Sequence, residues 1–128
     1  MSDLVMLAAW VLLAANVISL AYEVWRATAK SGTSRHDSMR VLLTQGTFIY
    51  GVAAVVLVLM FLGTAGSAWI GLVFVLISIA VSVFYYNPVV MPERDPGLID
   101  WVEDLVFTGL LFVAAAFLIL DVAGRTLS

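Results

Sequence analysis

The chain has 128 residues, of which 63% are hydrophobic and 12% are charged, and its mean hydropathy is +1.10. A soluble domain of this length carries about twice that share of charge, so the composition excludes a water-soluble globular protein and predicts a single membrane domain over residues 1–128. The net charge of −3 and the isoelectric point near 4.7 leave no basic surface for phosphates, which excludes a nucleic-acid partner.

The chain has no Cys and a single His, His36. Without Cys there can be no thiolate metal site, no disulfide exchange and no covalent attachment of haem through cysteine. One His cannot supply the paired axial ligands of a b-type haem. We therefore expect no cofactor and no bound metal, and we expect His36 to be a solvated loop residue.

Four tracts of the chain are long enough to cross a bilayer, which requires roughly 20 apolar residues. Residues 41–92 contain no charged residue and are too long for one span, but the segment GTAGS at residues 63–67 has the glycines and small polar residues of a turn. The uncharged tract Leu105–Leu120 reaches spanning length only if its helix begins earlier. The predicted helices cover about residues 4–26, 40–62, 66–87 and 97–122.

The three prolines, Pro88, Pro92 and Pro96, all lie between the third and fourth apolar tracts. Pro88 lacks an amide hydrogen and disfavours helical geometry at the preceding residue, so we expect it to end the third helix. Asp95 is expected to cap the fourth helix and Pro96 to open it. The first turns of that helix then hold several acids, which the helix dipole favours.

Basic residues are distributed unequally between the two ends of the predicted helices. The loops at residues 27–39 and 88–96, with their flanks, hold five of them, whereas the opposite side has only Arg125. The positive-inside rule therefore places both loops in the cytoplasm and both termini outside. We predict an all-α, antiparallel up-and-down four-helix transmembrane bundle, that is, a multi-pass protein of the cell membrane. The five basic residues are Arg26, Lys30, Arg35, Arg40 and Arg94.

Polar side chains of the predicted spans lie almost entirely in the cytoplasmic halves of the helices. In one interpretation they line a polar recess that opens to the cytoplasm, because polar groups inside a membrane often mark a functional site. In the alternative, small and hydroxylated residues let helices approach closely and exchange hydrogen bonds worth about 0.6 kcal/mol each. The candidate recess residues are Asn16, Ser19, Glu23, Arg40, Thr44, Gln45, Tyr85 and Asn87.

Glu23 is the acidic member of this set, and two partners are expected for it. It either pairs with Arg26 on its own helix or reaches water at the interface, or it faces inward and pairs with Arg40 on the neighbouring helix. The surrounding segment AYEVW, residues 21–25, is similar to the first helix of small multidrug transporters, whose glutamate lies in mid-span. Glu23 instead lies at the end of its helix, and we assign the chain to no family.

A second candidate site combines one arginine with three acids spaced i, i+3 and i+4 at the start of the fourth helix. One helix face can present two carboxylates to a hard cation such as Mg²⁺. Acids at a helix start more often act as partners of the helix dipole, and we favour that interpretation. As a surface, the set would serve as an acidic cluster or a cytoplasmic docking site. Its residues are Arg94, Asp100, Glu103 and Asp104.

Three classes of function remain for such a chain. The sequence favours a non-catalytic subunit or interaction module, whose partners are the lipid bilayer and other membrane proteins or a second copy of itself. The alternative is a small oligomeric channel or transporter, although the outer halves of the helices show no polar route. A membrane-embedded lipid-modifying enzyme is least favoured, because no pairing of a nucleophile with a base is recognisable.

Overall fold

The computed structural model describes the backbone of residues 3–127 and the side chains of residues 3–124. Within this part the chain is all-helical, and no strand is present. Four stretches of helix are long and apolar enough to cross a membrane. They are α1 (Asp3–Thr28); α2 (Met39–Val41), η1 (Leu42–Gly46) and α3 (Thr47–Phe61); α4 (Ser67–Val81), η2 (Ser82–Val90) and α5 (Met91–Glu93); and α6 (Leu98–Leu127). The segments η1 and η2 are π-helical and continue the helices on either side of them.

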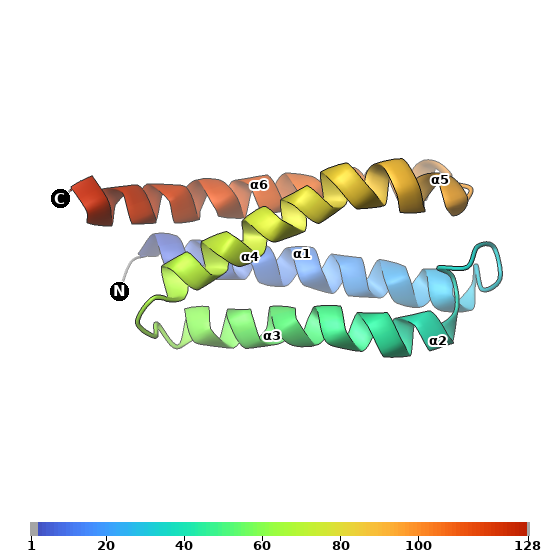
Figure 1. Ribbon diagram of the computed structural model, residues 1–128, viewed down its shortest axis with the longest axis horizontal. Helices are drawn as coiled ribbons and strands as arrows, with labels where there is room; N and C mark the ends of the chain where they lie inside the picture. The colour runs from blue at the N-terminus through green and yellow to red at the C-terminus, as the bar shows by residue number, and fades with distance from the viewer. Residues whose placement is uncertain (1–2, 128) are drawn as a thin grey trace.

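The helices lie side by side along one long axis (Figure 1). Both termini lie at one end of the molecule, and the connections at residues 29–38 and 94–97 lie at the other, which we call the loop end. Helix α6 packs against α1 and α4, and α3 packs against the same two helices. Each stretch therefore has two principal neighbours.

The aliphatic core occupies the half of the molecule that holds the termini. Each of the four stretches contributes residues at helical spacing, and most of them are fully buried. Gly71 of α4 permits the closest approach in this core, because a Cβ atom there would lie 2.8 Å from the Met60 sulfur of α3. The core residues are Val5, Ala8, Ala9, Leu12, Val56, Leu57, Met60, Ala68, Leu72, Val75, Leu111, Ala114, Ala115, Leu118 and Val122.

A tight turn separates α3 from α4, as the sequence predicts. Gly63 has φ 66° and Gly66 has φ 77°, which are left-handed conformations that glycine adopts without steric cost. The long uncharged tract is thus divided into two helical stretches by the GTAGS segment.

The prediction that Pro88 ends the third helix is wrong. Pro88 lies inside η2, and the helix continues through α5 as far as Glu93. A proline inside a long apolar helix is tolerated where local π-helical geometry and neighbouring groups satisfy the backbone carbonyl that the missing amide hydrogen leaves free. The helix therefore reaches about two turns further than the sequence suggests, and it delivers Arg94 to the loop end.

The start of α6 also differs from the prediction. Asp95 is in the left-handed region, with φ 54°, and does not cap the helix. The Asp100 side chain instead reaches back and accepts a hydrogen bond from the Gly97 amide, at 2.8 Å. This is the carboxylate half of a capping box, with Gly97 at the cap position. Asp100 thereby lies in the first helical turn, where the helix dipole favours an acid.

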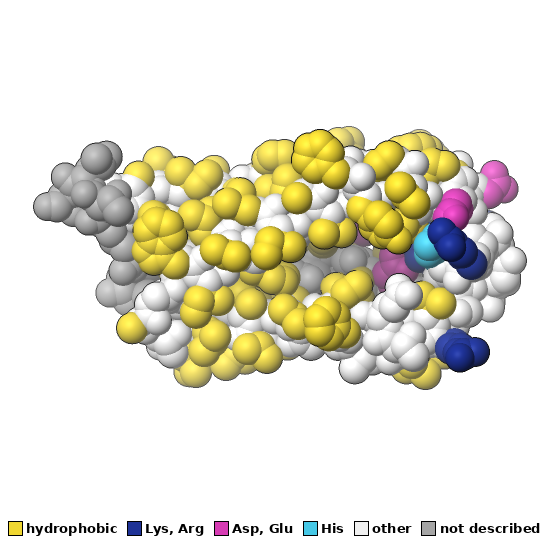
Figure 2. Space-filling view, in the orientation of Figure 1, with side chains coloured by type: hydrophobic (Ala, Val, Ile, Leu, Met, Phe, Trp, Pro, Cys, Tyr) yellow, Lys and Arg dark blue, Asp and Glu magenta, His cyan; other side chains and the backbone are white. Residues whose placement is uncertain are grey.

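Apolar and charged side chains separate along the long axis of the molecule. On the face shown in Figure 2, hydrophobic side chains cover most of the length, and Lys, Arg, Asp, Glu and His side chains gather at the loop end. Several of the largest apolar side chains are among the most exposed, for example Phe84 at 78% and Leu98 at 80%. The charged groups that could form a site are therefore concentrated at the loop end.

Candidate functional site

Arg94 is the centre of a buried ion-pair network at the loop end. Its guanidinium group donates to both carboxylate oxygens of Glu23, at 2.8 and 2.7 Å, and to the hydroxyl of Tyr86, at 3.0 Å. Its Nε atom lies 3.3 Å from Asp37 Oδ1 and makes no hydrogen bond. The side chain is 4% exposed. One arginine thus connects the end of the third helical stretch to α1 and to the loop at residues 29–38.

Arg26 of α1 forms the second half of the network. Its Nε and Nη2 atoms donate to the two oxygens of Asp37, at 2.8 and 2.5 Å. The same guanidinium reaches Asp100 Oδ1 at 3.2 Å and the Arg94 carbonyl at 2.8 Å. Arg26 is 1% exposed and Asp37 is 0% exposed. This fork-to-fork pair is the strongest geometry that an arginine and a carboxylate can adopt.

The ionisation of the loop residues follows from this arrangement. Burial alone would raise the pKa of Asp37, but hydrogen bonds from Arg26 and Ser34, and the charge of Arg94, outweigh it and hold the pKa below its usual value. Burial alone would lower the pKa of Arg94, but the hydrogen bonds to Glu23 outweigh that effect and raise the pKa. Asp37 and Arg94 are therefore both charged at neutral pH.

Asp100 and Asp104 of α6 are also buried and partnered. Asp100 accepts a short hydrogen bond from the Tyr22 hydroxyl in addition to its contacts with Arg26 and the Gly97 amide. The Asn87 amide nitrogen, oriented toward Asp104, lies 2.9 Å from each carboxylate oxygen. The two acids therefore face different partners on different helices.

A smaller set of polar contacts lies on the surface of the loop end. Arg35 and His36 both contact the Glu93 carboxylate, each at 3.0 Å. The expectation of a solvated His36 is thus wrong, because its ring is 14% exposed and bonded to Glu93. Next to it, Gln45 and Tyr85 border a pocket of about 180 Å³ that Arg35 and His36 also line.

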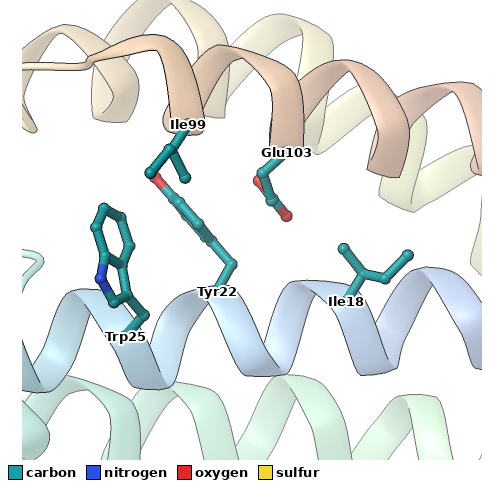
Figure 3. Close-up of a pocket in the computed structure, with 5 residues that line it drawn as sticks. All are labelled: Ile18, Tyr22, Trp25, Ile99 and Glu103. Atoms are coloured by element: carbon teal, nitrogen blue, oxygen red, sulfur yellow. The ribbon is translucent and has the colours of Figure 1, made fainter.

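The remaining acid, Glu103, lines an open groove of about 320 Å³ between α1 and α6. Figure 3 shows Ile18, Tyr22 and Trp25 rising from α1, with Ile99 and Glu103 facing them from α6. The Glu103 carboxyl group points into the space between the helices, beside the Tyr22 ring. Among the described residues, it has no hydrogen-bond or ion-pair partner. The Glu103 carboxyl group is therefore available to a ligand that enters this groove.

The predicted polar recess is not brought together as one surface. Asn16 bonds to the Leu12 carbonyl of its own helix at 2.9 Å, and Ser19 bonds to the Tyr50 hydroxyl at 2.7 Å. Arg40 and Thr44 are both exposed, and the Thr44 hydroxyl bonds to the Arg40 carbonyl.

The other four members of the set are dispersed as well. Gln45 and Tyr85 share the small surface pocket. Glu23 pairs with Arg94, at the end of the third helical stretch. Asn87 instead faces Asp104 of α6. These four residues thus lie in three different environments.

Glu23 pairs with neither of its two expected partners. Its carboxylate binds Arg94, which lies 71 residues further along the chain. Arg26 turns instead toward Asp37, and Arg40 is exposed. The correction has one physical cause, namely that the third helical stretch extends past Pro88 and places Arg94 against α1.

The sequence analysis assigns four of the network residues to neither candidate site. All four lie near the loop end, and each places the polar end of its side chain in a hydrogen bond of the network. The number of charges at the loop end is a signal that could have pointed to such a network. Acids and arginines beside apolar helices are costly to bury unless they pair with one another. The four residues are Tyr22, Arg26, Asp37 and Tyr86.

The acidic spacing of α6 does not produce a metal site. In the described part of the chain, no group of three or more His, Asp or Glu side chains is arranged to hold a metal ion. Asp100 turns to Arg26 and Tyr22, Asp104 turns to Asn87, and Glu103 enters the groove. The three acids therefore act separately.

Comparison of the chain with protein families, with curated proteins and with solved structures finds no match in any of the three. The geometry of the loop end is therefore the basis of the function proposed below.

Proposed function

We propose that this protein is an integral protein of the cell membrane that serves as a non-catalytic subunit or interaction module of a membrane complex. In this proposal the four helical stretches cross the bilayer as an antiparallel up-and-down bundle, with the loop end in the cytoplasm and the termini outside. Four stretches of spanning length and a largely apolar surface support the membrane placement. The basic residues around the two loops support the orientation.

The observation that carries the proposed role is the buried network around Arg26 and Arg94. It ties both loops to α1 and α6 through fully or nearly buried side chains. Such a network holds the surface of the loop end in one conformation. A surface that is already ordered favours the docking of a partner, because little conformational entropy is lost on binding. Its polar groups are almost all occupied by one another, which argues for a structural rather than a catalytic role.

Partner contact is proposed for the exposed residues that this network supports. Arg35 is 71% exposed and Glu93 is 36% exposed, and both lie on the loop end beside the small pocket at Gln45 and Tyr85. Arg94 and Asp100 of the predicted docking set are buried, so their contribution is to hold the loops in place. The partner is another membrane protein or a second copy of this chain.

Purification from native membranes tests this role. Tagged protein extracted in a mild detergent is expected to elute in a complex larger than one chain, with a defined partner stoichiometry. Arg35→Glu reverses an exposed charge and is expected to release the partner while the bundle stays folded. Asp3→Asn, at the opposite end of α1, serves as the matched control and is expected to retain it. A protein that elutes as a single chain under all mild conditions contradicts the role.

A second candidate function, a small oligomeric transporter or channel, is favoured by one observation. Glu103 presents a carboxyl group without a partner to a groove between two membrane-length helices. Acidic groups inside membranes commonly mark the paths of ions or substrates. Flux of a cation through liposomes that contain the purified protein, lost in Glu103→Gln, would support this function over the subunit role.

A further inference from the structure

The groove between α1 and α6 combines features that recognise one chemical class of ligand. Ile18 and Ile99 form its apolar sides, and the aromatic rings of Tyr22 and Trp25 form much of the α1 face. Glu103 supplies its acidic group from α6. A volume of about 320 Å³ lies within the range of small-molecule sites in proteins.

Formal charge is not balanced among the groups around Arg26 and Arg94. Two guanidinium groups face five carboxyl groups, and the other four carboxyl groups each have a hydrogen-bond partner, whereas Glu103 has none among the described residues. A cation seated beside Glu103 would offset part of this excess. The groups concerned are Arg26 and Arg94 with Glu23, Asp37, Asp100, Glu103 and Asp104.

The aromatic rings strengthen the preference for a cation. Cationic groups already lie within cation–π distance of both rings in the structure itself: Lys30 and Arg26 lie 5.6 and 5.9 Å from the centre of the Trp25 ring, and Arg94 lies 5.8 Å from the centre of the Tyr22 ring. Tyr22 keeps its hydroxyl on Asp100, which fixes the ring plane at the groove. Aromatic faces beside a carboxylate are the elements with which proteins bind quaternary ammonium groups.

We propose that this groove binds an amphiphilic organic ammonium ion that enters from the lipid phase. The ammonium group lies against Glu103 and the aromatic rings, and the apolar part lies along Ile18 and Ile99. A hard metal ion is disfavoured because a single free carboxylate supplies too few oxygen ligands. An anionic headgroup is disfavoured because Glu103, the ionisable acid that lines the groove, offers it no positive partner. The proposal rests on the membrane placement given above but not on the subunit role.

Binding of decyltrimethylammonium to the full-length protein tests the proposal. The protein is placed in phosphatidylcholine nanodiscs, and binding is measured by calorimetry against empty nanodiscs, with decyl sulfate as the anionic probe of equal chain length. We expect one saturable site for the cation and none for the anion. Glu103→Gln is expected to weaken binding at least tenfold, whereas Asp95→Asn, an exposed acid outside the groove, is expected to leave it unchanged.

A second variant keeps the test decisive if Glu103→Gln does not fold. Ile99 is 60% exposed, so Ile99→Trp fills the groove without disturbing the core, and it is expected to abolish saturable binding while circular dichroism stays unchanged. Equal binding in this variant and the wild type would overturn the proposal. Absence of saturable binding in the folded wild-type protein, or displacement of the probe by millimolar Mg²⁺, would also overturn it. A protein that co-purifies with a partner but binds no cation would leave the subunit role intact.

Discussion

Glu23 and Arg94 form a two-pronged ion pair across 71 residues of sequence, with donor–acceptor distances of 2.8 and 2.7 Å. Glu23 lies near the end of α1, and Arg94 lies at the end of the third helical stretch. Because Arg94 also contacts Asp37, it connects the start of the connection at residues 94–97 both to α1 and to the end of the loop at residues 29–38. The geometry of the loop end therefore depends on a small number of buried charges.

Removal of Arg94 is expected to be strongly destabilising. Arg94→Gln leaves Glu23 and Asp37 with less compensation in a buried site, and the loss of one partner of a buried pair costs about 3–5 kcal/mol of unfolding free energy. Reversible unfolding in mixed micelles measures this loss. The double variant Glu23→Gln/Arg94→Gln is expected to lose less than the sum of the two single variants.

Arg35→Gln is the matched control for this prediction. It also removes an arginine from an ion pair at the loop end, but that pair is exposed. Pairs in such positions contribute little to stability, so the midpoint of unfolding is expected to stay within error of the wild type. Equal losses for Arg35→Gln and Arg94→Gln would show that the buried network has no special role.

Acid is expected to weaken the fold in part through Asp37. The folded-state pKa of Asp37 lies below its usual value, so the unfolded chain binds the proton more tightly. The stability from this group is therefore fully present above the unfolded pKa of about 3.9 and is lost as the pH falls through the folded pKa. Unfolding measured between pH 6 and 2 should show a steeper loss in the wild type than in Asp37→Asn. Parallel curves for the two proteins would contradict the assignment.

Asp95 occupies a backbone conformation that glycine adopts at lower cost. With φ 54°, its left-handed geometry is strained for a residue with a Cβ atom. Asp95→Gly is expected to leave stability unchanged or to raise it by up to about 1 kcal/mol, whereas Asp95→Val should lower it by about 1 kcal/mol or more. Thermal unfolding in detergent compares the two variants. A larger loss for the glycine variant than for the valine variant would show that this turn is misassigned.

Gly71 is expected to be essential for the close contact between α3 and α4. Gly71→Leu places a side chain against the Met60 sulfur and should cost about 1–3 kcal/mol by overpacking. Met60→Ala removes the obstructing atoms, so the double variant should be more stable than the sum of the single losses predicts. Strict additivity in the same unfolding assay would place the two residues out of contact.

The helical architecture is largely readable from the sequence, because length and apolar composition determine which segments form helices long enough to cross a membrane. The turn at Gly63 and Gly66 and the acid in the first turn of α6 were predictable from local chemistry. The length of the third helical stretch, which continues past Pro88 to Glu93, was not predictable in this way. A proline that would end a soluble helix is tolerated in π-helical geometry, and that choice depends on the neighbouring helices rather than on the local sequence.

The candidate site was predictable only in part. Glu23, Asp100 and Arg94 were recognisable as charges beside apolar spans, but their partners were not, since ion pairs over 70 or more residues depend on helix rotation and packing. Asp37 was hidden because a loop acid is usually solvated, whereas here it is fully buried between two arginines. The Glu103 groove was not predictable, because it depends on how α1 and α6 pack together. Glu103 differs from Asp100 and Asp104 only in that those two acids have hydrogen-bond partners in the folded chain.

Cysteine labelling measures the membrane topology directly, because the chain contains no native Cys. Ser31→Cys lies in the exposed loop at residues 29–38, and Ala65→Cys lies in the exposed turn between α3 and α4. A membrane-impermeant maleimide added to intact cells or spheroplasts is expected to label Ala65→Cys, and to label Ser31→Cys only after the membrane is permeabilised. Labelling of Ser31→Cys from outside, or of both positions from the same side, would contradict a four-span bundle with its ion-pair network at the cytoplasmic face.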